Sequence, residues 1–267
     1  MYAVTSLGDE VFVARLRSQK VEVYDAGTLS LQRCIKVPGL GRNVYGLTAC
    51  TSNNCLYVSD WCNHSVHRAQ LAGGHVVMKW FVASRPAGLS VNNARNLVVA
   101  CLDGGENKLQ EYTTHGSLVR EICLQTGMTS PRHAVQLSSG DYVVSRNWSP
   151  GVVIVDVHGQ VLHMYGQLET PVGGLMGRPR GLAVTKNDDI LVADSGNHRI
   201  LSINTSLCSV QELALPVGDG MHYPWSLCLD ESRGRLYVGE YGGKCRVLVF
   251  GDVGCGSYTT LPNTMFV

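Results

Sequence analysis

Arginine and aromatic residues recur just in front of a series of short apolar runs. The set comprises Arg85, Arg132, Arg178, Arg180, Tyr45, Tyr223 and Trp225. Guanidinium groups pair with carboxylates and phosphates, and rigid rings supply contact area, so the combination is typical of surfaces that bind peptides. It is also typical of single-stranded RNA sites, where bases stack on rings and phosphates meet cations. We expect these residues to form the binding site; the alternative is a solvated rim of scattered charges.

Patterns that perform catalysis are weakly represented. The ten cysteines include no Cys-x-x-Cys pair, and the chain has no Gly-x-Ser-x-Gly turn and no glycine-rich phosphate loop leading into a helix. We therefore predict no catalytic residue, no metal and no cofactor.

The apolar runs belong to an internal repeat. A small residue followed by alternating apolar positions recurs at intervals of roughly 45 residues, a period typical of propeller blades. The repeats begin near Ala3, Gly46, Gly88, Ala134, Gly181 and Ser226. Small residues are expected there because the innermost strands crowd around the central axis.

Each repeat divides into four short strands, of which the second is apolar throughout and the fourth is more polar. The sequence thus predicts an all-β fold, a six-bladed β-propeller with four antiparallel strands per blade, as one domain over residues 1–267. Because the chain begins in an innermost strand and ends in an outer one, no strand is left to swap between the first and last blades. Only the tail 262–267 could add one.

One blade carries a fuller motif. Asp194-Ser195-Gly196-Asn197-His198-Arg199-Ile200 resembles the NHL repeat, and residues 60–66 carry a degraded copy. The resemblance is to the NHL domain found at the C-terminus of tripartite-motif ubiquitin ligases, where it selects substrates or binds RNA. No RING or B-box pattern of cysteine and histidine is present, so ligase activity itself is not expected in these residues. We expect Asn197, His198, Asp60 and Asp194 to be turn residues rather than ligands.

Enzymes with related propellers supply the third hypothesis. Amidating lyases place histidine directly after proline at several blade entrances to bind zinc, and gluconolactonase-like propellers hold a cation with central carboxylates. In this chain the residues that follow proline are Ala87, Arg132, Arg180 and Trp225. His133 stands one residue late and His222 precedes Pro224, which does not make the usual three-ligand zinc site. A metal-dependent lyase or lactonase remains the alternative to a binding protein.

Composition restricts the partners. A net charge of +1 excludes bulk electrostatics as the basis of binding, and no apolar run is long enough to span a membrane. We expect a monomeric propeller that binds a protein or peptide, or RNA, and no membrane. The absence of a signal peptide at the start favours the cytoplasm. Three sequons (Asn63, Asn147, Asn204) and two hairpin cysteine pairs (Cys50 with Cys55, Cys245 with Cys255) keep an extracellular location open.

Overall fold

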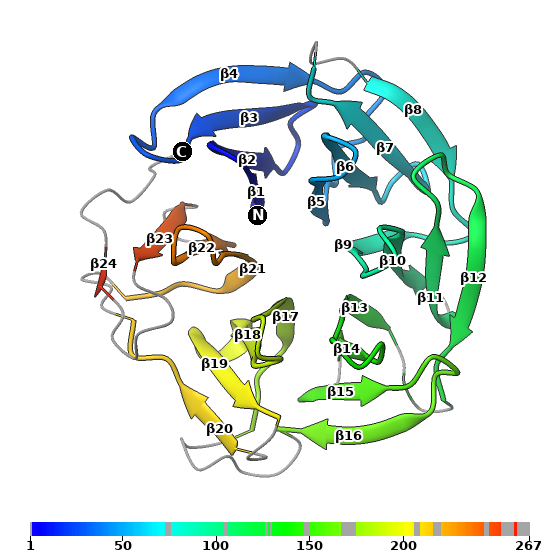
Figure 1. Ribbon diagram of the computed structural model, residues 1–267, viewed down its shortest axis with the longest axis vertical. Helices are drawn as coiled ribbons and strands as arrows, with labels where there is room; N and C mark the ends of the chain where they lie inside the picture. Colours follow the sequence, from blue (N-terminus) through cyan, green and yellow to red (C-terminus); the bar gives the residue numbers. More distant parts are fainter. Residues whose placement is uncertain are drawn as a thin grey trace.

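Six four-stranded antiparallel sheets surround a central channel in the computed structural model of the chain (Figure 1), which confirms the expected fold class. Each sheet is built from four consecutive strands, ordered from the channel to the rim. The structure describes residues 2–72, 76–103, 106–125, 128, 130–146, 150–166, 175–205, 209–215, 220–242, 246–251 and 259–260.

The strands fall into four concentric sets. The innermost strands are β1 (Tyr2–Leu7), β5 (Leu47–Cys50), β9 (Pro86–Val91), β13 (Pro131–Gln136), β17 (Pro179–Val184) and β21 (Pro224–Asp230). The second strands are β2 (Glu10–Arg15), β6 (Cys55–Asp60), β10 (Leu97–Asp103), β14 (Tyr142–Arg146), β18 (Ile190–Asp194) and β22 (Arg235–Glu240). The third strands are β3 (Lys20–Asp25), β7 (Ser65–Gln70), β11 (Glu106–Tyr112), β15 (Val152–Val155), β19 (Arg199–Asn204) and β23 (Val247–Gly251). The outer strands are β4 (Leu31–Lys36), β8 (Val76–Phe81), β12 (Leu118–Cys123), β16 (Val161–Tyr165), β20 (Ser209–Glu212) and β24 (Thr259–Thr260).

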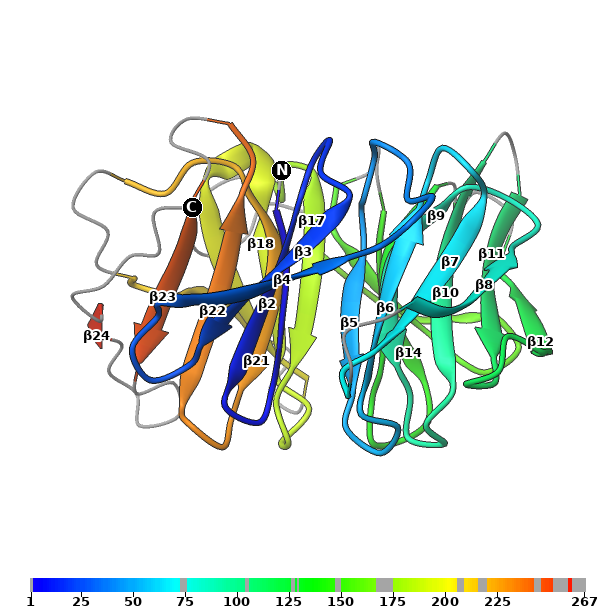
Figure 2. The same cartoon turned by 90° about the horizontal axis from the view of Figure 1, so that it is seen from above.

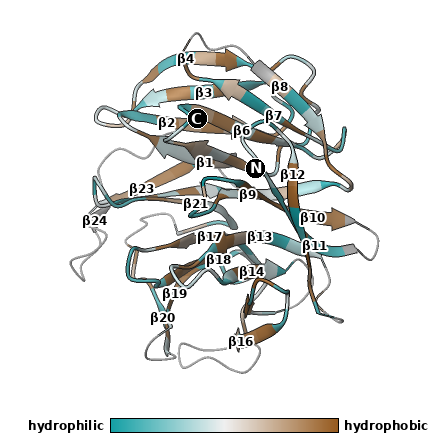
Figure 3. Ribbon diagram, turned by 45° about the vertical axis from the view of Figure 1, so that its right-hand side comes forward, coloured by the Kyte–Doolittle hydropathy of each residue, from teal (hydrophilic) through white to brown (hydrophobic). Residues whose placement is uncertain are grey.

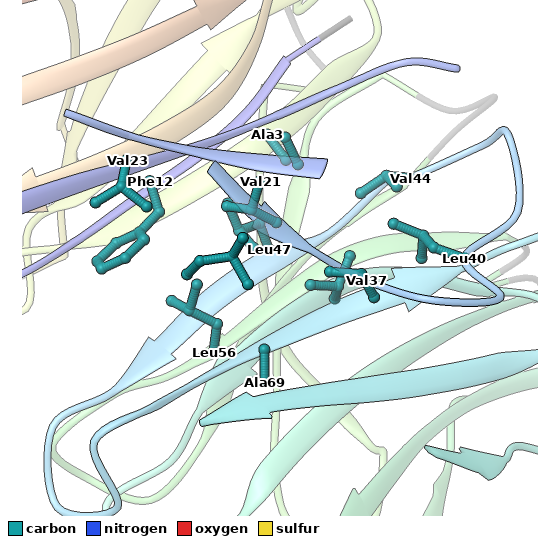
Figure 4. Close-up of a cluster of buried hydrophobic side chains, with 13 residues drawn as sticks. Ala3, Phe12, Val21, Val23, Val37, Leu40, Val44, Leu47, Leu56 and Ala69 are labelled. Carbon is teal, nitrogen blue, oxygen red and sulfur yellow. The ribbon is translucent and has the colours of Figure 1, made fainter. Parts of the chain in front are cut away.

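The core lies between neighbouring blades. Every residue of β6, β14 and β18 is buried, as expected for strands covered on both faces, whereas β4 and β12 are mostly exposed. Between the first two blades, Phe12, Val21 and Leu56 pack in one apolar cluster (Figure 4). Hydrophobic and hydrophilic segments accordingly alternate along the strands (Figure 3).

Close approach of the innermost strands explains the small residues of the repeat. A Cβ atom on Gly88 would lie 2.7 Å from the carbonyl oxygen of Arg132, and one on Gly181 would lie 2.8 Å from that of Trp225. Gly46 differs slightly from its expected place, because β5 begins one residue later. The amide of Gly46 donates to the side-chain hydroxyl of Ser59 on β6 (2.6 Å) rather than to the backbone of that strand.

The first and last blades meet without a strand exchanged between them in the described part of the chain, as β24 pairs with β23. The Val4 amide donates to the Ser226 hydroxyl (3.0 Å), and an Arg233 guanidinium nitrogen donates to the Gly8 carbonyl (2.6 Å). Val4 also packs with Tyr237 in an apolar cluster shared by the two blades. Side-chain contacts therefore hold the ring closed here; the tail 262–267 lies outside the described residues.

A buried acid ends the second strand in three blades, at Asp60, Asp194 and Glu240. We call these residues the acid anchors. Asp194 accepts hydrogen bonds from the Gly177 amide (2.6 Å), Asn197 Nδ2 (2.9 Å) and Arg199 Nε (2.9 Å). The carboxylate thus ties the turn after β18 to the connection that enters the blade.

The other residues of the NHL-like motif are also structural. Ser195–Asn197 form a single 3-10 turn (η1), and His198 follows it in the left-handed conformation at φ 58°. Its Nδ1 accepts the Tyr223 amide (3.0 Å). Asn197 and His198 therefore lie in a turn, as expected, whereas Asp60 and Asp194 are the last residues of their strands.

Two described sequon asparagines already use their side-chain amides. Asn63 Nδ2 donates to Asp60 (2.7 Å) and Asn204 Nδ2 donates to Asp189 (2.8 Å). Cys50 and Cys55 stand opposite each other across the β5–β6 hairpin with free thiols. Asn147, Cys245 and Cys255 lie outside the described residues. Within the described ranges, no helix has the length and apolarity needed to cross a membrane.

Candidate binding site

The blade entrances, by which we mean the residues that lead into each innermost strand, lie at one face of the ring. Seen edge-on, the strands run between the two faces, so the hairpins joining first to second strands lie at the opposite face (Figure 2). Four innermost strands begin with proline, which lacks an N–H and suits the first position of a strand. The entrance side chains therefore surround one mouth of the channel.

A β-bulge follows the entrance proline in these blades. Pro131 pairs with Arg146 and His133 with Ser145, which leaves Arg132 without an opposite residue. The register shifts in the same way between Pro179 and Leu182, between Pro224 and Ser226, and in the β9–β10 pair. Bulges re-aim the side chain of the extra residue. This local geometry presents Arg132, Arg180 and Trp225 at the mouth of the channel.

Buried serines of the second strands fix the entrance backbone. The Ser145 hydroxyl donates to the Arg180 carbonyl oxygen (2.6 Å), across the boundary between two blades. The Ser59 hydroxyl accepts the Tyr45 amide (3.2 Å). Each bond joins an entrance residue to a buried strand, so the entrance side chains project from a rigid base.

Four of the seven expected residues are in direct contact across the channel mouth. The guanidinium carbon of Arg132 lies 4.3 Å from the Tyr45 ring centroid and 4.8 Å from that of Trp225. The Arg180 guanidinium lies 4.4 Å from the Trp225 ring, and the two rings are 6.4 Å apart. We call Tyr45, Arg132, Arg180 and Trp225 the mouth cluster. Its members come from four different blades, as ring closure requires.

The two arginines of the mouth cluster are buried, at 5% and 9% exposure for Arg132 and Arg180. Burial and the charge of Arg180 lower the pKa of Arg132 to about 9, and Tyr45 raises it in part. Burial and the charge of Arg178 likewise lower the pKa of Arg180 to about 10. Both groups still carry a proton at neutral pH. The channel mouth therefore holds two desolvated positive charges instead of the solvated rim that was the alternative.

The other three expected residues lie around this centre. Arg85 is half-buried, with its guanidinium 4.2 Å from the ring of Trp61, which in turn lies 5.6 Å from Tyr45. Arg178 is exposed. Tyr223 is 45% exposed and contacts His198 at 4.2 Å between ring centroids, so it belongs to a neighbouring group rather than to the mouth cluster.

Trp61 and Tyr241 are two contact residues outside the expected set. Tyr241 stacks 4.9 Å from Trp225 and is 45% exposed. Each of the two directly follows an acid anchor, Asp60 or Glu240, at the end of a second strand. This position could have identified both residues from the sequence, because the turn after a second strand lies at the same face as the entrances.

His133 lines the channel and bridges two other blades. Its Nε2 donates to the Leu89 carbonyl oxygen (3.1 Å), while its Nδ1 accepts the Leu182 amide (3.0 Å). Both ring nitrogens are thus engaged within the protein in the neutral tautomer. His222 lies instead beside His198, with ring centroids 6.1 Å apart. Among the described residues, no three His, Cys, Asp or Glu side chains are grouped as a metal site.

We expect His133 to make the protein less stable as the pH falls below about 6.5. Burial, followed by the charge of Arg132, lowers its pKa from 6.5 to about 4, so the unfolded chain takes up the proton first. The stability that neutral His133 contributes is complete above pH 6.5 and is lost between pH 6.5 and 4. We expect a loss of about 2 kcal/mol, discounted for partial exposure to the channel.

Urea unfolding of wild type and His133→Gln at pH 7 and pH 4.5 measures this loss, and the variant should show the flatter pH dependence. His163→Gln is the control, because it removes an exposed imidazole on β16 without touching the channel. Equal pH dependence in wild type and His133→Gln would contradict the expectation.

The channel is narrow. It has a volume of about 270 Å³ and is walled by innermost strands of all six blades. The mouth cluster lies at one end, and both apolar residues such as Leu89 and hydroxyl-bearing residues such as Thr48 and Ser90 line the wall. A space of this size accepts a side chain or a chain terminus rather than a folded domain.

Comparison with known proteins supports the fold. Residues 176–201 match the NHL repeat, and no curated protein sequence matches the chain. A protein of unknown function from Bacteroides caccae is similar at a TM-score of 0.74 and 16% identity, covering 91% of this chain and 90% of its own. The nidogen/laminin complex contains a similar chain (TM-score 0.71, 17% identity, coverage 95% and 91%). Virginiamycin B lyase from Staphylococcus aureus is similar at 0.70 and 15% identity, with coverage of 98% and 84%.

These similarities agree with the blade count, the topology and the motif in the fifth blade. The chain is a six-bladed β-propeller that contains an NHL repeat.

Proposed function

We propose that this propeller binds a protein partner at the face that carries the mouth cluster, without catalysing a reaction. The observation that carries the proposal is the concentration of desolvated arginines and aromatic rings at one end of the channel. Arginine, tryptophan and tyrosine dominate the energetics of protein interfaces. Exposed Tyr223 and Tyr241 extend this surface outward from the channel.

A protein partner suits the rings better than RNA does. Bases bind by stacking on open aromatic faces. Here two guanidinium groups already lie over Trp225 and one lies over Tyr45, so these rings offer less open surface to a base. RNA binding is therefore an outcome of the test rather than the proposal.

The engagement of His133 argues against the zinc-dependent lyase alternative. A zinc ligand needs a free ring nitrogen, whereas both nitrogens of His133 are hydrogen-bonded to blade backbones. Virginiamycin B lyase and nidogen share this fold, so the fold alone favours neither function. As a finer proposal, the chain recruits substrates in the manner of the tripartite-motif NHL domains that it resembles.

Selection of random peptides on the full chain tests the proposed face. We expect enriched peptides to bind the Arg85→Glu/Arg178→Glu double variant at least about tenfold more weakly than wild type, because two cations at the mouth are reversed. Both side chains are more exposed than Arg132 and Arg180, so the variant should stay folded. Arg95→Glu, in the β9–β10 hairpin at the opposite face, is the matched control and should bind like wild type.

Equal binding of the peptides to wild type and the double variant would remove this face as the site. Single-stranded oligouridylate is titrated in parallel at two salt concentrations. RNA binding that falls steeply with salt and depends on Arg85 and Arg178, with no peptide enriched, would replace the protein partner with RNA.

A further inference from the structure

Arg132 is the most deeply buried charge of the channel mouth. Its side chain is 5% exposed, and its Nη2 atom is buried without a hydrogen-bond partner among the described residues. Buried guanidinium groups are normally paired with an acid, because desolvation otherwise penalises the charge. Within the described chain, Arg132 is paired with aromatic rings instead.

Two other arginines, Arg199 and Arg246, show how the same chain pairs a buried cation with an acid. Arg246 donates to Glu240 (2.9 Å) and Arg199 donates to Asp194 (2.9 Å), both buried acid anchors. The fourth blade ends its second strand in Arg146, so no acid anchor stands there. After burial, the largest influence on the pKa of Arg132 is the positive charge of Arg180, which lowers it. Arg132 is thus held in place without the counter-charge that Arg199 and Arg246 have.

The surroundings of Arg132 select the kind of anion. Its guanidinium lies over the rings of Tyr45 and Trp225, so hydrogen bonds can form only at the N–H edge that the rings leave open. A planar carboxylate meets such an edge with two parallel hydrogen bonds. A phosphate group carries more charge and has three oxygens that need donors, more than one N–H edge supplies.

We propose that the channel mouth receives one carboxylate of the partner, which pairs with Arg132 beside Arg180. The inference rests on the proposed function and adds to it the chemistry of the recognised group. The carboxylate comes from an acidic side chain or from the partner's C-terminus, both of which fit a channel of about 270 Å³. Trp225 and Tyr45 hold the guanidinium in position before the ligand binds, so binding costs little additional side-chain entropy.

Three short peptides separate these sources. The first is N-acetylated and C-amidated with a central glutamate, the second replaces that glutamate with glutamine, and the third is the glutamine peptide with a free C-terminal carboxylate. Binding to the full chain is followed by NMR chemical shifts. We expect at least one carboxylate peptide to bind at least about tenfold more tightly than the neutral peptide. Arg132→Met should remove that difference, and Arg95→Met, in the β9–β10 hairpin at the opposite face, should preserve it.

The outcomes are distinct from those of the selection experiment. Preference for the glutamate peptide or for the free C-terminus supports the proposal and names the source. Equal affinity for all three peptides, or a preference that survives in Arg132→Met, would overturn it. Arg132-dependent binding of inorganic phosphate or oligouridylate, with neither carboxylate peptide bound, would also overturn it. If selected peptides bind the wild type but not Arg85→Glu/Arg178→Glu, the proposed binding face is supported whatever the result with the three short peptides.

Discussion

Replacing Asp194 with alanine is expected to lower the free energy of unfolding by about 3 kcal/mol. The carboxylate is fully buried and accepts hydrogen bonds from Gly177, Asn197 and Arg199. Its removal leaves the Arg199 side chain, 10% exposed, without its buried partner. Removing one member of a buried ion pair costs about 3–5 kcal/mol, because a desolvated charge is left behind. Urea unfolding at neutral pH measures the loss.

Glu212→Ala is the matched control for this variant. Glu212 also contacts Arg199, at 3.4 Å, but its side chain is 47% exposed. Exposed ion pairs contribute about 0–1 kcal/mol, so this variant should unfold close to wild type. Equal losses in the two variants would show that burial of the acid anchor does not decide its contribution. The result also tests whether the hydrogen-bonded Asp, Asn and Arg of the NHL-like motif stabilise the fold of the blade.

Much of the fold could be predicted because every blade has to meet the same packing requirements, and these leave the same pattern in each repeat. Each blade needs a second strand that is apolar on both faces and an innermost strand that starts with a small residue, and both features are visible in the sequence. The third and fourth strands of the fourth blade, β15 and β16, lie at the predicted residues 152–155 and 161–165. The start of β5 is off by one residue, because the Gly46 amide donates to the side-chain hydroxyl of Ser59 on β6 and not to the backbone of that strand.

The candidate site was predictable only in outline. Ring closure brings entrance residues of different blades to one mouth, so the position of Arg132, Arg180 and Trp225 follows from the repeat. Their burial does not, because arginine is usually exposed and nothing local shows that two rings cover it. The bulge after each entrance proline is also invisible in the sequence, since it depends on the register with the second strand.

Tyr223 lies apart from the mouth cluster, although like Arg132 it stands beside an entrance proline. It precedes Pro224 and has a φ of 45°. Its amide donates to His198, and its ring contacts that histidine rather than the mouth cluster. The three members of the mouth cluster that stand beside an entrance proline all follow it, whereas Tyr223 precedes one. Which side of the proline a residue occupies therefore indicates its place better than its distance from the proline does.

Arg132→Met is expected to stabilise the folded protein by about 1–2 kcal/mol while removing its response to a carboxylate. Burial and the charge of Arg180 lower the pKa of Arg132 to about 9, and each pKa unit corresponds to about 1.4 kcal/mol, so holding this charge costs several kcal/mol. The cation–π contacts with Tyr45 and Trp225 each offset about 1 kcal/mol of this cost. Methionine fills similar space and keeps favourable contacts with Tyr45 and Trp225, so most of the packing is retained.

Thermal unfolding measures both parts of this expectation. In buffer alone, the melting temperature of Arg132→Met should exceed that of wild type by a few degrees, since 1 kcal/mol shifts a domain of this size by about 2–4 °C. Arg95→Met, which removes an exposed cation in the β9–β10 hairpin, should change it by less. A carboxylate peptide at saturating concentration should then raise the melting temperature of wild type and of Arg95→Met, but not of Arg132→Met, because a ligand stabilises only the folded state that binds it. A lower melting temperature for Arg132→Met in buffer would mean that the aromatic contacts outweigh the desolvation of the guanidinium. In that case the channel mouth would be a structural stack, with no surplus charge for a ligand to neutralise.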